Sequence, residues 1–102
     1  MKVDELDKDI IWLLAQNSGL TPFKISKLLK VPEQKIRYRL ANLESNNWIK
    51  RSSKGYVLNK RTVIATQDVL ILFGKKGFWV FTAKANPRRL VRYLREALEQ
   101  HG

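Results

Sequence analysis

The chain has 102 residues and 44% hydrophobic composition, which suffices for one compact domain and is too short for two ordinary ones. It contains no cysteine, so disulfides and thiolate metal sites are excluded. Its net charge of +11 favours phosphate polymers or an anionic membrane surface as partners, although no apolar stretch reaches the roughly 20 residues that span a bilayer.

A first helix is expected from about Asp4 to Asn17. Its acidic start suits a helix, because side-chain oxygens cap free amides and negative charge matches the positive end of the helix dipole. The five residues from Ile10 to Leu14 are all apolar and wrap more than half of the helix circumference, so one face cannot absorb them. Trp12 lies off the face that a three-helix core would use, and we therefore expect it in a dimer interface.

A short second helix should follow the break at Asn17, Ser18 and Gly19. Thr21 can cap it, and Pro22 fits its first position because an amide is not needed there. Apolar and basic residues separate onto two faces. The inner face has Ile25, Leu28 and Leu29, and the outer face has Lys24, Lys27 and Lys30.

A third helix, over about 33–46, and a hairpin over 48–59 are the most basic part of the chain. Residues 21–61 contain eleven Lys or Arg against two Glu, a net charge of +9. The apolar positions Ile36, Leu40 and Leu43 recur at one-turn spacing, which leaves the polar positions on other faces. In the hairpin we expect Ser52 to Gly55 to turn, with Arg51 and Lys54 at the tip.

A set of capping and core positions in the first half of the chain forms a recognisable pattern: Asp4, Asp7, Ile10, Leu13, Leu14, Thr21, Ile25, Ile36, Leu40, Leu43, Glu44 and Ile49. With these positions the chain resembles, over about residues 3–60, the winged helix-turn-helix of the leucine-responsive and asparagine-regulator transcription factors. It departs from the family pattern at Lys30 and Asn47, where the family usually has Gly, and at Pro32, where it usually has Ser.

The resemblance implies that the third helix enters the major groove of duplex DNA and that the wing touches flanking backbone. Arg37 is the best candidate to bind guanine, and Gln34 to bind adenine. The alternative is an ordinary solvated helix face. Trp48 and Tyr56 are expected to pack the base of the wing rather than to stack on bases. The candidate DNA-binding residues are Gln34, Lys35, Arg37, Tyr38, Asn42, Arg51 and Lys54.

The second half of the chain, residues 62–102, is expected to form a β-hairpin and an amphipathic helix. Two apolar runs, 69–73 and 78–82, flank a Gly-Lys-Lys-Gly turn, and a strand at about 62–66 is possible. Neither run alternates with polar residues, so both faces of the hairpin should be covered. The final helix begins at Pro87 and carries a stripe of Leu90, Leu94 and Leu98, which we expect in a dimer interface with Trp12. The alternative is a monomer in which this helix packs over the hairpin.

The predicted fold is α+β: a winged helix-turn-helix of three helices and a β-hairpin wing, followed by a hairpin and an amphipathic helix. The predicted function is sequence-specific binding of double-stranded DNA by a homodimeric transcription regulator, cytoplasmic and associated with the nucleoid. The alternatives are an architectural DNA-binding protein of low specificity and a winged-helix adaptor for proteins. No phosphate loop or catalytic group of residues is present, so we predict a non-enzyme without a cofactor. The sequence does not indicate an effector.

Overall fold

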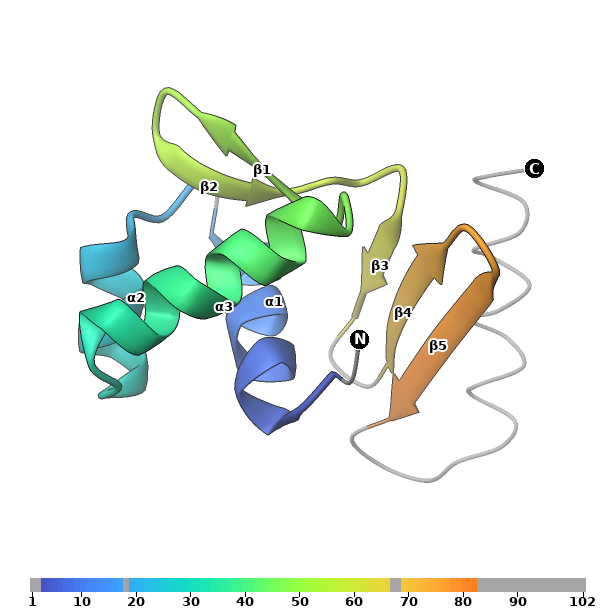
Figure 1. Ribbon diagram of the computed structural model, residues 1–102, viewed down its shortest axis with the longest axis horizontal. Helices are drawn as coiled ribbons and strands as arrows, with labels where there is room; N and C mark the ends of the chain where they lie inside the picture. The colour runs from blue at the N-terminus through green and yellow to red at the C-terminus, as the bar shows by residue number, and fades with distance from the viewer. Residues whose placement is uncertain (1–2, 18, 67–68, 83–102) are drawn as a thin grey trace.

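The computed structural model describes residues 3–17, 19–66 and 69–82 (Figure 1). Three helices precede two antiparallel sheets, one with strand order β1-β2 and one with order β3-β4-β5. This is an α+β winged helix arrangement, as predicted. The elements are α1 Glu5–Gln16, α2 Pro22–Leu29, α3 Glu33–Ser45, β1 Ile49–Ser52, β2 Gly55–Leu58, β3 Val63–Ala65, β4 Val69–Gly74 and β5 Gly77–Thr82.

The helices begin where local side chains satisfy free backbone amides. Asp4 accepts a hydrogen bond from the amide of Asp7 at 3.0 Å, and Asp7 accepts one from the amide of Asp4 at 3.2 Å, which forms a capping box. Thr21 accepts from the amide of Lys24 at 3.2 Å, with Pro22 at the first helical position. These predicted helix starts are confirmed. In contrast, α3 follows Pro32 without a side-chain cap.

Two helix ends use a non-glycine residue in the left-handed conformation. Lys30, with a φ of 57°, ends α2, and Asn47, with a φ of 62°, follows α3. Asn adopts this conformation more readily than most residues, which explains why it can stand at position 47 in place of the usual Gly. The structure accommodates both of these departures from the family pattern without a change in topology.

One hydrophobic core joins the helices, the base of the wing and the inner face of the three-stranded sheet. Ile10, Ile11 and Leu14 of α1 are buried, and Leu70 and Leu72 of β4 pack into the same cluster. The sheet therefore covers a side of α1 that the other helices leave free, which is how one chain accommodates the long apolar run of this helix (Figure 1).

Trp12 has a partner within the chain. Its indole Nε1 donates to the carbonyl oxygen of Thr66 at 2.7 Å, and its ring packs half-buried against the core. Its position off the face of the three-helix core is therefore explained without a second copy. The assignment of Trp12 to a dimer interface stays a prediction.

The two strands of the second hairpin differ in how well they are covered. Strand β4 is buried on both faces, because Leu70 and Leu72 join the main core while Val69 and Ile71 form a second cluster on the other face. Near the turn, β5 leaves Phe78 57% exposed. The prediction that both faces of this hairpin are covered is thus confirmed for β4 and wrong for the turn end of β5. The predicted strand at 62–66 is confirmed as β3.

The predicted final helix lies outside the described residues. Leu90, Leu94 and Leu98 lie there as well, so their assignment to a dimer interface stays a prediction.

Candidate nucleic-acid interface

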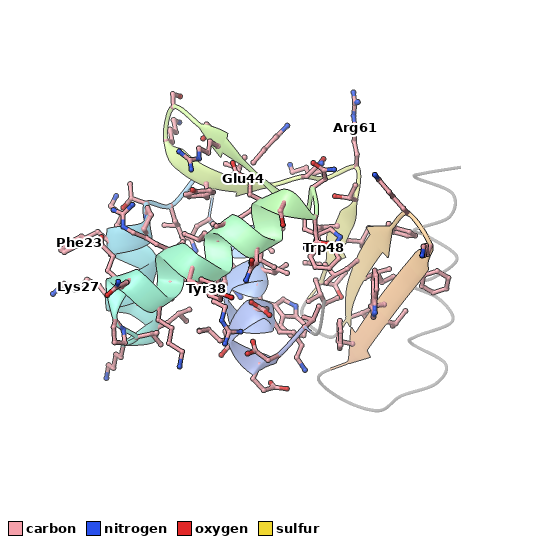
Figure 2. The ribbon with its side chains drawn as sticks, in the orientation of Figure 1. Phe23, Lys27, Tyr38, Glu44, Trp48 and Arg61 are labelled. Atoms are coloured by element: carbon pink, nitrogen blue, oxygen red, sulfur yellow. The ribbon has the colours of Figure 1, made fainter. Side chains whose placement is uncertain are left out.

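Helix α3 presents an exposed face, opposite its buried stripe, to the surroundings. Ile36, Leu40 and Leu43 are fully buried on one side. Successive residues of an α-helix are rotated by about 100°, so the line opposite this buried stripe runs through Gln34, Tyr38, Ala41 and Ser45. All four are exposed, and Tyr38, at 67%, lies in the middle of the helix (Figure 2).

The other predicted DNA-binding residues of α3 flank this line on two sides. Arg37 lies on the same side of the helix as Glu44, which contacts the wing through Arg51. Lys35 and Asn42 lie on the opposite side, with Lys35 exposed and Asn42 half-buried. The structure therefore places all five predicted residues of α3 on or beside the outward face of one helix.

Arg37 has an acidic neighbour on the same helix. Its Nε lies 2.7 Å from a carboxylate oxygen of Glu33, one turn away, and its side chain is 61% exposed. Exposed ion pairs of this kind contribute about 0.3 to 0.5 kcal/mol. A phosphate or a guanine edge can therefore replace Glu33 as the partner of Arg37 at little energetic cost.

The wing is a tight hairpin with its turn at Ser53 and Lys54. Ser52 pairs with Gly55, and Arg51 pairs with Tyr56 one step before the turn. The predicted position of Arg51 at the tip is therefore wrong, because a two-residue turn closes the hairpin beyond it. The Arg51 guanidinium lies 5.5 Å from the ring centre of Tyr56 and 3.3 Å from Glu44. Lys54 lies in the turn and is exposed, as predicted.

The wing is fixed to the connection between α1 and α2. Leu20 and Tyr56 exchange two backbone hydrogen bonds, at 3.0 and 2.8 Å. Gly55, with a φ of 109°, passes so close that a β-carbon there would lie 2.5 Å from the backbone of Leu20. Any other residue at this position would push the wing away from the helices. The turn that carries Lys54 therefore has a defined position relative to α3.

The base of the wing packs against the second sheet. Trp48, which lies between α3 and the second sheet in Figure 2, is 1% exposed. Its indole Nε1 donates to the carbonyl oxygen of Phe73 at 3.0 Å, and its ring meets Trp79 edge to face at 5.7 Å. Tyr56 is half-buried against the main core. The predicted packing of Trp48 at the base of the wing is confirmed, whereas Tyr56 packs on the core next to the turn of the wing, because it pairs with Arg51. That neither ring stacks on bases stays a prediction. The sequence did not indicate that the partner of Trp48 comes from β4 and β5.

One charge cluster beside the interface was missed by the sequence predictions. Arg39 of α3 binds the carboxylate of Asp4 and lies 3.4 Å from that of Asp7. The hydrogen bond from Arg39 is the main cause that lowers the pKa of Asp4 from 3.8 to about 2. Burial raises the pKa of Asp7, one of whose carboxylate oxygens is buried and has no hydrogen-bond partner among the residues that the structure describes. Arg39 is thereby held toward α1 and away from the outward face.

The Asp4 contact should contribute to stability in a defined pH range. The pKa of Asp4 is lower in the folded state, so its contribution is present above about pH 4 and is lost as the pH falls toward 2. Asp7 acts in the opposite direction, because protonation of a carboxylate whose pKa is raised by burial favours the folded state. We expect Asp4→Asn, which keeps a capping side chain, to destabilise the fold by about 1 kcal/mol or less at pH 7.

Urea unfolding of wild type and Asp4→Asn between pH 7 and pH 2 measures this effect. The difference in free energy of unfolding between the two proteins should disappear as the pH falls below about 4. Glu5→Gln is a matched control, because it removes the same charge from the same helix turn and contacts Lys8 rather than Arg39. If the difference between wild type and Asp4→Asn stayed constant on acidification, the stabilising role of the Asp4–Arg39 contact would be contradicted.

Two other kinds of site, a metal site and a membrane-spanning helix, are absent from residues 3–17, 19–66 and 69–82. They contain no group of three or more His, Cys, Asp or Glu side chains placed to hold a metal ion. None of the helices that the structure describes has the length and apolar character needed to cross a bilayer.

Comparison with known proteins found one related family. Residues 3–50 match a family described as winged helix-turn-helix DNA-binding, over all three helices and the start of β1. No curated protein and no solved structure matched the chain. The family match and the fold agree that residues 3–50 resemble a winged helix-turn-helix DNA-binding domain.

Proposed function

We propose that the chain is a sequence-specific double-stranded DNA-binding protein and a transcription regulator of the leucine-responsive and asparagine-regulator type. Helix α3 would enter the major groove, and the wing would contact flanking backbone. The main support for the proposal is the exposure and composition of the outward face of α3. It is exposed along its whole length, it is polar around Tyr38, and it lies beside a basic hairpin that backbone contacts hold in place.

The chemistry of this face suits base recognition better than phosphate binding alone. Its central line has the amide of Gln34 and the ring of Tyr38 but no charged side chain. An amide can bind adenine in a bidentate manner, and an apolar ring can contact the methyl group of thymine. The positive charge lies at the flanks, where Lys35 and Lys54 can meet phosphates and Arg37 can reach a guanine edge.

Two rival functions share this fold. An architectural protein would bind DNA through phosphates with little sequence preference, and the strong positive charge of the chain is compatible with it. A protein-binding adaptor fits less well, because residues 21–61 have a net charge of +9 and a wing with an exposed lysine at its turn. The uncharged centre of the α3 face favours the sequence-specific function over both rivals.

Selection of bound fragments from random duplex DNA, at near-physiological salt, tests the proposal. A narrow consensus is the expected result. Recovery of an unenriched pool would favour the architectural function, and recovery of no DNA at any salt would contradict DNA binding altogether.

We expect the helix and the wing to contribute differently to binding. Arg37→Ala or Gln34→Ala should reduce discrimination at one base pair by about 1 to 3 kcal/mol, because side chains in the major groove distinguish bases. Lys54→Ala should weaken specific and random duplexes equally, because a turn lysine contacts backbone. Titrations of each variant with both duplexes measure the difference. Equal losses on both duplexes for Arg37→Ala would contradict the role of Arg37 in base recognition.

We also propose a homodimer, which would place two copies of α3 on one duplex. The support is the amphipathic pattern of the final segment, with Leu90, Leu94 and Leu98 on one stripe. Sedimentation equilibrium measures the assembly state directly.

A further inference from the structure

Four basic side chains outside α3 and the wing are exposed and have no acidic partner among the described residues. Lys60 and Arg61 lie in the connection between β2 and β3, and Lys75 and Lys76 form the turn between β4 and β5. From Ser45 to Thr82 the chain has seven Lys or Arg and a single acidic residue, Asp68.

The pairing of β3 with β4 brings these two turns together. Val63 pairs with Leu72, and the ladder continues one step further, where the amide of Phe73 donates to the carbonyl oxygen of Thr62 at 2.8 Å. Arg61 directly precedes Thr62, and Lys75 follows Phe73 by two residues, so the two turns flank the same end of the β3-β4 pair. In Figure 1 both turns lie along the same upper side of the molecule as the wing, and in Figure 2 Arg61 projects outward from that side.

Both turns are tied to the end of α3 by several contacts. The carbonyl oxygen of Asn47 accepts hydrogen bonds from Asn59 at 2.9 Å and from Thr62 at 2.5 Å, on either side of Lys60 and Arg61. The β4-β5 hairpin is held by Trp48, through its hydrogen bond to Phe73 and its contact with Trp79. The position of the four cations relative to α3 and the wing is therefore set by the core.

We propose that Lys60, Arg61, Lys75 and Lys76 form a basic ridge that binds phosphates of the same duplex beyond the wing. This inference rests on the proposed DNA-binding function and extends its footprint from one hairpin to two. Charges that only maintained solubility would not need a particular position or a lack of acidic neighbours. These four cations lie on two turns fixed to α3, and none has an acidic partner among the residues that the structure describes. Phosphate contacts of this kind would position the protein on the duplex and would not distinguish sequences.

Salt titrations of the full chain on a labelled duplex of about 25 base pairs test the ridge. Loss of two phosphate contacts in the double variant Lys75→Gln, Lys76→Gln should make the slope of log affinity against log salt shallower by about 1.8. Binding at 0.1 M salt should weaken by about sixtyfold, since two contacts at about 0.9 log units each are lost one decade below 1 M salt. The double variant Lys75→Arg, Lys76→Arg keeps the charge and should behave as wild type. Circular dichroism checks that each variant is folded.

These experiments distinguish failure of the ridge proposal from failure of the proposed DNA-binding function. If the wild type binds the duplex and the Gln variant has the same slope and affinity, the ridge proposal is wrong. The proposed function of α3 and the wing is not contradicted by that result. If the wild type binds no duplex, both fail. If the Arg variant loses as much as the Gln variant, positive charge is not the cause, and the phosphate-binding role is wrong.

A cross-linking measurement gives an independent test, because the chain has no native cysteine. A photoreactive group attached to Lys76→Cys should cross-link to bound duplex with a yield comparable to that from Lys54→Cys in the wing. The control is Gln16→Cys, an exposed position at the end of α1. A yield from position 76 no higher than that from position 16 would overturn the proposal.

Discussion

Replacing Trp48 with alanine should lower the free energy of unfolding by about 3 to 5 kcal/mol. The side chain is 1% exposed and is one of the largest in the core, so its removal loses buried apolar area and leaves a cavity. The change also removes the hydrogen bond to the carbonyl oxygen of Phe73 and the edge-to-face contact with Trp79. Domains of this size are stable by about 5 to 15 kcal/mol, so the variant should be close to unfolding.

Urea denaturation followed by circular dichroism measures this loss, and two further variants divide it into its causes. Trp48→Phe keeps an aromatic ring without the indole donor, and we expect it to cost less than Trp48→Ala. Trp79→Ala should cost less still, because Trp79 is 40% exposed. A loss below about 1 kcal/mol for Trp48→Ala would show that the wing base does not depend on the second sheet.

Duplex affinity should fall roughly a thousandfold between 50 and 200 mM salt. If about six phosphates are neutralised per protomer, the slope of log affinity against log salt is near −5, at roughly −0.9 per phosphate. Exposed cations on the second helix, the third helix and the wing are numerous enough to supply these contacts. They are Lys24, Lys27, Lys30, Lys35, Arg37, Lys50, Arg51 and Lys54.

Fluorescence anisotropy of a labelled duplex across this salt range measures the slope. The expected value separates the proposed function from a neutral docking surface, whose affinity would change little with salt. A slope between 0 and −1 would mean that at most one phosphate is bound, and it would contradict the placement of α3 and the wing on DNA. Lys35→Gln combined with Lys54→Gln should reduce the slope by about 1.8.

The helices could be predicted from the sequence because their signals are local. The capping box at Asp4 and Asp7 spans four residues, and Thr21 with Pro22 defines the start of α2 within two. The apolar stripe of α3 recurs at each turn of the helix, so the buried and outward faces follow from spacing alone. The candidate DNA-binding residues of α3 were found for the same reason.

The sequence also predicted both hairpins but not the position of each residue within them. The pairing of Ser52 with Gly55 decides that Lys54 lies in the turn and that Arg51 lies on the strand beside Glu44. A shift of one residue in the register would reverse the faces of every wing side chain. Several turns are compatible with the same Ser-Ser-Lys-Gly run, so composition alone could not choose among them.

By itself the sequence determined the order and type of the elements, the outward face of α3 and the excess of positive charge. Only the tertiary structure decided which distant residues meet. Trp12 contacts Thr66, Trp48 contacts Phe73, and Arg39 contacts Asp4, over separations of 54, 25 and 35 residues. Periodicity describes which face of an element is apolar, but it does not specify which other element covers that face. The packing of the second sheet against α1 and the base of the wing settles this, and it brings the basic turns of the chain to one side of the molecule.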